Sequence, residues 1–365
     1  MKLRIIRSKF IEGLKTVQNI VGGKGSLAVL QNVLLEASGK ELKMTTTDLD
    51  ISISTVCECE VLEAGNTTLP VKFLFNAISK VVEGDVELYV DAKDRATIQA
   101  GKAKYNIAGL PYTDFPKLPN DEQSCEYKIL QATFKEMLRK VYYAASQDDT
   151  RRTLKGVLVS FKDGNVTMVA TDGRRLALTK NELEFPKSAE KDIVLPSKAV
   201  AELQRSLNGE GEAIMQVNKT QLCFKFENTT IYSKLMDEVY PNYNQVIPKE
   251  TIHEIAVDRQ LLLDALERVN VMTMDEAHST KLIFSEGKLT VTSAASDIGD
   301  AKDEVEIKYS GEEKIEIIFN PNYIMDCLKA IDEDEITVNL NDGHSPAIIK
   351  CKSPFLYVLM PLRIS

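Results

Sequence analysis

Three short segments of this sequence carry residue types that could do chemistry. Cys57 and Cys59 lie in the alternating run 51–61, so their thiols would face the same side of a strand and could supply two zinc ligands. A tetrahedral site needs two more ligands, and no second cluster supplies them, so we interpret the pair as packed thiols. The run 22–26, Gly-Gly-Lys-Gly-Ser, is partly like a phosphate-binding loop, but Gly25 replaces the hydroxyl that would bind magnesium. We expect neither a metal nor a cofactor.

A third segment, Thr171-Asp172-Gly173, could place a catalytic carboxylate in a turn. General acid–base catalysis needs a partner group at useful spacing, and none accompanies Asp172. The sequence also lacks the serine-hydrolase, zinc-protease and dinucleotide-binding motifs. We therefore interpret Asp172 and Gly173 as residues that shape the backbone of a turn. An enzyme is an alternative that the motifs do not favour.

Composition indicates a folded protein with a cytoplasmic location. The chain has 365 residues, of which 44% are hydrophobic, enough for two or three domains with their own cores. No window approaches the roughly 20 apolar residues that span a bilayer, and the first residues lack the apolar stretch of a secretory signal. The cysteines are scattered, which favours free thiols. The net charge of −9 argues against a nucleic-acid partner unless the positive charges gather in one place.

The elements that must position these residues occur three times along the chain, with a period near 125 residues. Each copy opens with an amphipathic segment of helical periodicity, at 6–21, 130–146 and 257–272. A strand pair follows, and its turn contains one glycine that can adopt a positive φ: Gly39, Gly164 and Gly287. A second helix then follows a proline in each copy: Pro70, Pro196 and Pro321.

The three copies also end alike. In each copy the last expected strand ends at two consecutive residues, and these residue pairs are 125 positions apart: Leu110-Pro111, Leu235-Met236 and Met360-Pro361. Proline-rich stretches after the first two copies are expected linkers. The pattern predicts an α+β protein made of three tandem domains, each with two helices on antiparallel sheet, at 1–125, 126–250 and 251–365.

This organisation and two local motifs resemble a known family. Residues 170–177 (Ala-Thr-Asp-Gly-Arg-Arg-Leu-Ala) and 357–363 (Tyr-Val-Leu-Met-Pro-Leu-Arg) are similar to motifs of the bacterial replicative sliding clamp, the β subunit of DNA polymerase III. The resemblance covers the whole chain. It implies that two chains join head to tail into a six-domain ring, with helices lining the hole and sheets forming the outer wall. It also implies a role without catalysis, in which the ring tethers the replicative polymerase to duplex DNA for processive synthesis.

Charge distribution agrees with a helix-lined hole that holds DNA. The six expected helical segments together carry a net charge of +6, which leaves −15 for the rest of the chain. Positive helices in an otherwise acidic protein would discourage DNA from binding anywhere else. The alternative interpretation is that basic residues simply occupy solvated helix faces.

Helix width decides how many chains a ring needs. Helices about 10 Å across, set side by side, enclose a hole of roughly 9 Å with six helices and roughly 28 Å with twelve. Duplex DNA is about 20 Å wide. One chain cannot encircle it and two can, so a homodimer follows if the helices line the hole, a premise that comes from the resemblance.

The resemblance implies two sets of contact residues for the ring. DNA would meet basic residues, without regard to base sequence, at Lys24, Lys72, Arg151, Arg152, Lys198 and Arg205. The two chains would meet where Tyr105 and Ile107, on an edge strand, lie against Val271 and Met272. Opposite charges surround these positions: Arg95, Lys102 and Lys104 on one side, and Asp297, Asp300, Asp303, Glu304 and Glu306 on the other. The alternative interpretation is that the acidic run is a solvated loop.

The resemblance also implies a groove between domains two and three. It would take short peptides with Leu and Phe anchors from the polymerase alpha subunit, the clamp loader and other clamp-binding proteins. The matching positions are Leu154, Thr171, Gly173, Arg174, Arg175, Leu176, Pro241, Val246, Val358, Leu359, Met360, Pro361 and Arg363. The chain departs from a common family pattern at Gln245, where Arg is often found.

A repeat scaffold that recruits proteins without encircling DNA is the second alternative. The charge distribution and the closing geometry weigh against it. Retention on closed circular DNA, compared with linear DNA, would distinguish a ring from such a scaffold.

Overall fold

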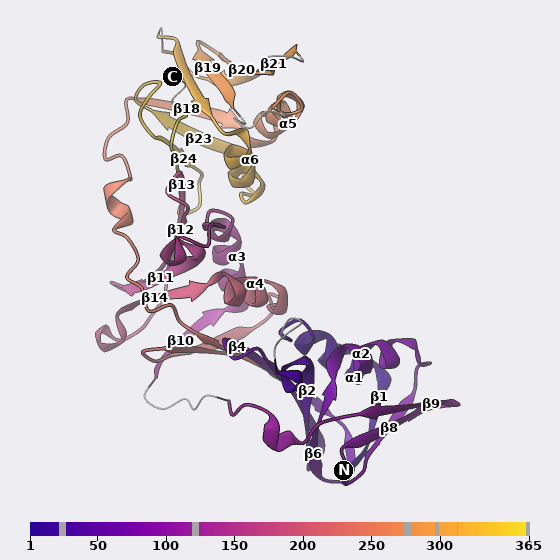
Figure 1. Ribbon diagram of the computed structural model, residues 1–365. Coiled ribbons are helices and arrows are strands. Elements are labelled where there is room, and N and C mark those ends of the chain that lie inside the picture. Colours follow the sequence, from indigo (N-terminus) through magenta and orange to yellow (C-terminus); the bar gives the residue numbers. More distant parts are fainter. Residues whose placement is uncertain (22–26, 119–123, 274–278, 296–298, 312, 363–365) are drawn as a thin grey trace. The chain divides into compact units, whose positions relative to one another are not determined.

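The computed structural model describes residues 1–21, 27–118, 124–273, 279–295, 299–311 and 313–362. Lys24, Asp297 and Arg363 lie outside these residues. Within them the chain forms helices and antiparallel strands in three copies of one pattern (Figure 1). Contacts divide the chain into two compact units. The first consists of Met1–Ala132 and Ala201–Leu235, and the second consists of Thr133–Val200 and Met236–Ser365. The second copy is therefore divided between the units.

Six helices form in the described residues, two in each copy as the sequence predicts. The first helix of each copy is α1 (Arg7–Val17), α3 (Gln131–Tyr142) and α5 (Arg259–Asn270). The second is α2 (Val71–Lys80), α4 (Ser197–Ser206) and α6 (Pro321–Lys329). All are shorter than the periodic segments. Helix α1, for example, ends at Val17 although the apolar pattern continues to the buried Ile20, because burial requires only an inward-facing side chain and not a helical backbone.

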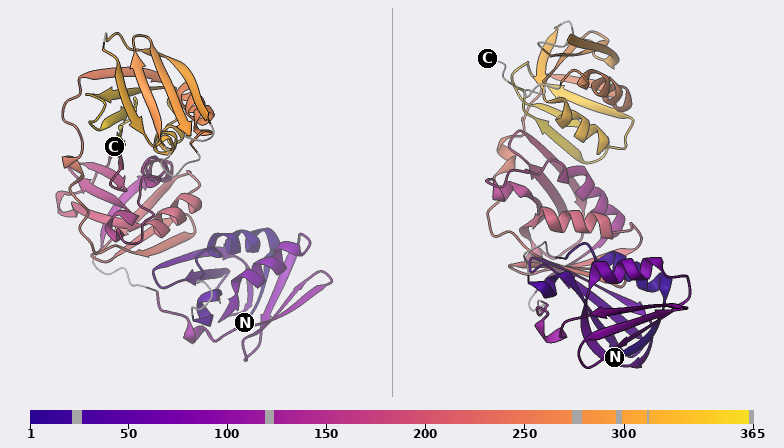
Figure 2. Two further views of the ribbon diagram at one scale, coloured as in Figure 1. Left: turned by 45° about the horizontal axis from the view of Figure 1, so that its top comes forward. Right: turned by 45° about the vertical axis from the view of Figure 1, so that its right-hand side comes forward.

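Each helix buries one apolar stripe, and most of the side chains on its other faces are polar, with exceptions such as Phe73 of α2 and Leu261 of α5. In α1 the stripe is Phe10, Leu14 and Val17, all fully buried, and each such side chain contributes roughly 1.5–3 kcal/mol by leaving water. Helices α1 and α2 pack side by side over the strands of copy one, and α5 and α6 do so in copy three (Figure 2). No helix among the described residues is long and apolar enough to cross a membrane.

Strands make up most of each copy. Copy one contains β1 (Lys2–Ile6), β2 (Asn32–Ser38), β3 (Glu41–Thr47), β4 (Ile51–Glu58), β5 (Glu60–Glu63), β6 (Gly65–Pro70), β7 (Asp85–Val90), β8 (Arg95–Ala100) and β9 (Ala103–Ala108). Copy two contains β10 (Cys125–Leu130), β11 (Gly156–Lys162), β12 (Asn165–Thr171), β13 (Arg175–Glu182), β14 (Lys191–Pro196), β15 (Glu212–Val217), β16 (Gln221–Phe226) and β17 (Thr229–Lys234). Copy three contains β18 (His253–Asp258), β19 (Thr280–Ser285), β20 (Lys288–Ala295), β21 (Gly299–Lys308), β22 (Ile315–Phe319), β23 (Glu335–Leu340), β24 (Ala347–Lys350) and β25 (Phe355–Leu359).

The expected hairpin turns are present. β2 and β3, β11 and β12, and β19 and β20 pair in antiparallel register. Their turn glycines all have a positive φ, of 59° at Gly39, 68° at Gly164 and 66° at Gly287. Side chains with a Cβ rarely adopt this conformation, which explains the recurrence of glycine at these positions.

Sheets continue across the boundaries between copies. One sheet has the strand order β10-β15-β16-β17-β4-β3-β2-β6, and another runs β14-β11-β12-β13-β25-β24-β23-β18-β21-β20-β19-β22. The junctions are the antiparallel pairs β4 with β17 and β13 with β25. At the first junction Ile53 lies opposite Ile231, and both side chains are fully buried. Main-chain hydrogen bonds and apolar burial therefore join neighbouring copies as they join strands within one copy.

The residues that are structurally equivalent at the ends of the copies differ by one position from those matched in the sequence. The amides of Leu110, Met236 and Leu362 donate to carbonyls on the equivalent strands β6, β14 and β22, at 3.0, 3.1 and 2.8 Å. Matching by residue type instead placed Leu110 with Leu235 and Met360. The hydrogen bonds show that the equivalent residues are 126 apart, because pairing depends on strand position and not on side-chain type.

Replacement of Ile231 by Ala should destabilise the first junction. Deleting a fully buried aliphatic side chain costs about 2–5 kcal/mol of unfolding free energy, which urea denaturation can measure. Ile252, 76% exposed, is the control, and its replacement by Ala should change the free energy by less than about 0.5 kcal/mol. Equal losses in the two variants would show that this junction is not part of the core.

Candidate functional site

An apolar cluster lies on one face of the junction between β13 and β25. Leu176 of β13 stands opposite Val358 of β25, and both are 2% exposed. Leu158, Val169 and Val194, on the adjoining strands β11, β12 and β14, complete the buried cluster. Side chains alternate along a strand, so this face is opposite the one that carries Arg175 and Tyr357.

Residues of the expected linker cover part of this cluster. Met236, Tyr240, Tyr243 and Ile247 are partly buried against it, and burial raises the pKa of the Tyr240 hydroxyl above its ordinary value. The proline-rich composition predicted a linker, so the sequence analysis missed these contacts. Their apolar spacing at 240, 243 and 247 is a signal that could have found them. Val246, beside Ile247, remains 41% exposed.

The rim of the cluster consists of a tight turn and the chain's ending. The Thr171 hydroxyl accepts a hydrogen bond from the Gly173 amide at 3.1 Å, and Asp172 Oδ1 accepts from the amides of Arg174 and Arg175 at 2.9 and 3.0 Å. Asp172 and Gly173 therefore shape a turn, as predicted. The Met360 amide donates to the Arg174 carbonyl at 2.9 Å, and the Met360 side chain is 37% exposed. The ending is thus tied to the rim while Met360 stays partly exposed.

Two residues that the sequence assigned to the groove point to the other face. The Arg175 side chain is only 10% exposed and ion-pairs with Asp326 of α6 at 2.6 Å. Leu359 is 1% exposed and alternates with Val358, so it faces the same side as Tyr357. The remaining described positions lie on or beside the turn, the linker and β25, with Leu154 half-buried in the short 3₁₀ segment Arg152–Lys155.

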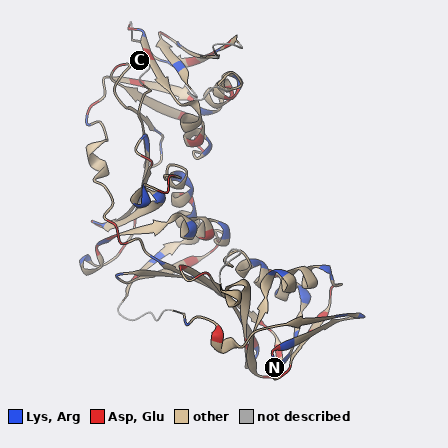
Figure 3. Ribbon diagram, viewed as in Figure 1, with Lys and Arg blue, Asp and Glu red and all other residues tan. Residues whose placement is uncertain are grey.

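The expected DNA-contacting residues are dispersed over both units. Lys72 on α2, Arg152, and Lys198 and Arg205 on α4 are exposed. Figure 3 shows Lys and Arg along the helices. Arg205 also pairs with the buried Glu202. Arg151 differs from the others, because its Nη1 donates to the Asp172 carbonyl at 2.8 Å, beside Gly173. This guanidinium therefore supports the turn.

The expected dimer residues lie on an edge strand and directly after a helix. Tyr105 and Ile107 are half-buried on β9, which forms the edge of its sheet. Val271, directly after α5, is 64% exposed, and Met272 beside it is half-buried.

The first junction has the same turn but a polar face. The Thr47 hydroxyl accepts from the Leu49 amide at 3.1 Å, and Asp48 Oδ1 accepts from the Ile51 amide at 2.9 Å, as in the turn at Thr171. Ser52, however, stands opposite Tyr232, where the second junction has Leu176 opposite Val358. The apolar cluster is therefore a property of the second junction.

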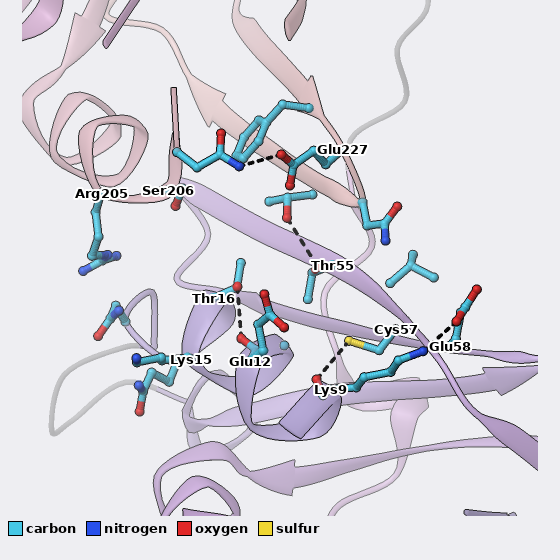
Figure 4. Close-up of a pocket in the computed structure, with 18 residues that line it drawn as sticks. Lys9, Glu12, Lys15, Thr16, Thr55, Cys57, Glu58, Arg205, Ser206 and Glu227 are labelled. Carbon is cyan, nitrogen blue, oxygen red and sulfur yellow. Dashed lines mark hydrogen bonds and ion pairs between the residues drawn. The ribbon is translucent and has the colours of Figure 1, made fainter. Parts of the chain in front are cut away.

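A cavity of about 790 Å³ lies beside the first junction (Figure 4). It is lined by α1, β4, the end of α4 and the turn after β16. Lys9 and Glu58 neutralise each other there at 2.6 Å. The Cys57 thiol donates to the Lys9 carbonyl at 3.4 Å, and burial raises the pKa of this thiol to about 11. No group of three or more His, Cys, Asp or Glu in the described parts of the chain could hold a metal ion. The contacts of Cys57 agree with a packed thiol.

Comparison with known proteins places every part of the chain in one family. Models of the DNA polymerase III beta subunit match its N-terminal domain at residues 1–119, its central domain at 128–242 and its C-terminal domain at 244–363. The beta sliding clamp of Chlamydia muridarum is 30% identical over 364 residues, covering 100% of this chain and 99% of the relative. That of Caulobacter vibrioides (strain NA1000 / CB15N) is 32% identical over 375 residues, covering 100% of both. The crystal structure of a sliding clamp from Pseudomonas aeruginosa bound to griselimycin is 28% identical, with a TM-score of 0.96 and 100% of each chain covered.

Replacement of Gly173 by Ala should strain the turn more than the same change at Gly39. Both glycines have a positive φ, which costs a residue with a Cβ about 1–2 kcal/mol. A Cβ at Gly173 would lie 3.1 Å from Arg151 Nη1, whereas one at Gly39 would meet no described atom within 4 Å. Displacing Arg151 should add about 1 kcal/mol to the loss at Gly173. Urea denaturation measures both variants, and equal losses would argue that Arg151 contributes nothing to the turn.

Proposed function

The chain belongs to the family of the DNA polymerase III beta subunit, the beta sliding clamps, and from that membership we propose that two copies close into a ring around duplex DNA. The proteins of this family are processivity factors rather than enzymes. They have a role in DNA replication, with DNA and a polymerase as partners. The observation that carries the proposal is that the matches to this family extend along the whole chain. We further propose domain bounds of 1–125, 126–250 and 251–365.

Two unpaired strand edges supply a means of closing the ring. β4 and β13 have the same place in copies one and two, and each pairs with the last strand of the following copy. The corresponding strand in copy three is β21, and the last strand of copy one is β9. In the described chain β9 ends its sheet, and residues 299–306 of β21 pair with β20 on one side only. We infer that β21 of one chain pairs with β9 of the other.

The internal junctions also indicate the register of this pairing. Residues 51–55 pair with 233–229, and 175–179 pair with 359–355. If β21 and β9 pair in the same register, residues 299–303 of one chain lie opposite residues 107–103 of the second chain. This register puts Lys102 opposite Glu304, a favourable pair. It also turns Tyr105 and Ile107 toward α5, the side on which Asp303 pairs with Arg268.

Exposed apolar side chains support a second copy as the partner. At the second internal junction, the ring of Tyr143, after α3, and the ring of Tyr323, on α6, both lie against the Arg175 guanidinium. The corresponding residues at the open edges are Val271, after α5, and Phe73, on α2. They are 64% and 71% exposed. Large exposed apolar side chains at matching positions are typical of an interface.

We propose that DNA is held by topology and only weakly by contact. Lys24, Lys72, Arg151, Arg152, Lys198 and Arg205 would meet phosphates. Of these, Arg151 also bonds to the Asp172 carbonyl and Arg205 also pairs with Glu202. Phosphate contacts are insensitive to base sequence and weaken as salt rises. A closed ring would remain on circular DNA even when these contacts are screened.

The apolar cluster and its partly exposed rim support a peptide-binding groove at the second junction. The floor would be Leu176 and Val358, and the rim Met360, Val246 and the turn at Gly173. Exposed Met suits different anchors because its thioether is flexible. Occupants would be short Leu- and Phe-containing segments of the polymerase alpha subunit, the clamp loader and other partners. Gln245, exposed beside Val246, would adjust affinity for individual segments.

Replacing Ile107 by Asp should prevent ring closure, because the new charge would be buried at the second chain. We expect monomer mass in solution, and no retention on nicked circular DNA after loading and gel filtration at high salt. The unaltered protein should be retained until the DNA is linearised. Leu62→Asp is the matched control, since Leu62 is 50% exposed on β5 at the opposite edge of the same sheet. A dimeric Ile107→Asp variant would contradict the pairing, and release from intact circles would contradict the ring.

Deleting residues 360–365 should abolish binding of a Leu- and Phe-containing partner peptide while the dimer persists. The deletion removes the Met360 side chain and its bond to Arg174. Met360→Asp should weaken binding without shortening the chain. Val239→Asp is the control, because Val239 is 91% exposed on the same linker that covers the cluster. Fluorescence anisotropy of the labelled peptide measures each affinity, and unchanged affinity after the deletion would place the groove elsewhere.

A further inference from the structure

We propose that Arg175 is a positioning residue for the groove, acting from the face of the sheet that a bound peptide would not touch. In this inference, which rests on the proposed peptide-binding function, its guanidinium ties the turn at Asp172 to helix α6. The two sides of the groove come from different copies, β13 from copy two and β25 from copy three. A tie between the copies would keep the groove formed before a peptide arrives.

The Arg175 guanidinium uses all of its nitrogen atoms in this tie. Nε contacts Asp172 Oδ2 at 3.1 Å, Nη1 contacts Asp326 Oδ2 at 2.6 Å, and Nη2 donates to the Tyr143 carbonyl at 2.7 Å. The Tyr323 ring lies under the guanidinium at 4.3 Å from centroid to Cζ. These partners belong to the turn, to α6 and to the segment after α3. One side chain thus connects elements of both copies.

The neighbouring strand converges on the same helix. The Tyr357 hydroxyl of β25 donates to the Tyr323 carbonyl at 2.8 Å, and its ring lies 5.9 Å from that of Tyr143. Leu176 follows Arg175 and Val358 follows Tyr357, so each anchored residue is next to a residue of the groove floor. Because successive side chains point to opposite faces, anchoring one residue fixes where the other is presented.

The contacts also extend from α6 to the rim. Asp172 Oδ2 is held by the guanidinium while its Oδ1 accepts from the Arg174 amide at 2.9 Å. The Arg174 carbonyl in turn accepts from the Met360 amide at 2.9 Å. Rotation of the Asp172 carboxylate would therefore disturb the strand end that carries Met360.

The first junction lacks both this tie and the apolar floor. The residue at the position of Arg175 is Ile51, which pairs with Ser233 as Arg175 pairs with Leu359. On the opposite face, Ser52 and Tyr232 replace Leu176 and Val358. The buried arginine and the apolar floor therefore occur together at one junction and are both missing from the other.

Lys would not replace Arg175, because an ammonium cannot reach two carboxylates and a carbonyl in fixed directions or stack its plane on Tyr323. If the formed groove becomes a minor population, the apparent affinity falls by that fraction. The loss then appears in the association rate, while a peptide bound in the formed groove dissociates as before. A residue that touched the peptide would change the dissociation rate instead.

Stopped-flow binding of a labelled Leu- and Phe-containing peptide tests this distinction in the full-length dimer. We expect Arg175→Lys and Asp326→Asn each to slow association, roughly tenfold for Arg175→Lys, with dissociation unchanged. The double variant should be no slower than Arg175→Lys, because both act through one contact. Arg139→Lys is the control, since Arg139 lies at the same junction but its ion pairs are with Glu136 and Asp332 instead of with the turn. Asp326 is 44% exposed, so its Asn variant should fold if Arg175→Lys does not.

Faster dissociation with unchanged association would overturn the proposal, as would unchanged rates in both variants. Equal slowing by Arg139→Lys would also overturn it, because any disturbance of the junction would then suffice. If the unaltered dimer failed to bind the peptide, the proposed groove itself would be wrong, a result distinct from these outcomes.

Discussion

Main-chain pairing between the edge strands of neighbouring copies is the interaction on which the rest of this structure depends. An edge strand exposes amide and carbonyl groups that need partners, and a free edge invites pairing with another chain. β4 meets this need with β17, and β13 meets it with β25. Three copies joined in this way leave one such edge at each end of the series. The same constraint that builds the chain therefore favours a second chain, and it sets the register in which that chain would pair.

The pairing of β13 with β25 also creates the candidate groove. It brings Leu176 and Val358, far apart in sequence, to opposite positions on one face. The same backbone arrangement exists at β4 and β17, where the corresponding residues are Ser52 and Tyr232. Geometry alone therefore does not make a binding site. The difference lies in which side chains occupy equivalent positions, apolar at one junction and polar at the other.

The charge of the chain suits its proposed work with DNA. A net charge of −9 would weaken phosphate binding if it were spread evenly. Lysines and arginines instead occur on exposed positions of α2 and α4, while the acidic strand β21 lies at an edge proposed to meet another chain. In the proposed ring, modest contact with DNA is an advantage, since a topological tether has to slide.

The sequence by itself determined the three copies, the six helices and the turn glycines, because apolar periodicity and positive φ act over a few neighbouring residues. The motifs at 170–177 and 357–363 identified the family. Only the tertiary structure decided which face each residue of β13 and β25 presents, and it placed Arg175 and Leu359 on the face opposite Leu176 and Val358. It also brought Tyr240 and Ile247 from the linker to the cluster. The physical reason is that strand register is set by hydrogen bonds to a distant partner, and a side chain's face follows from that register rather than from residue type.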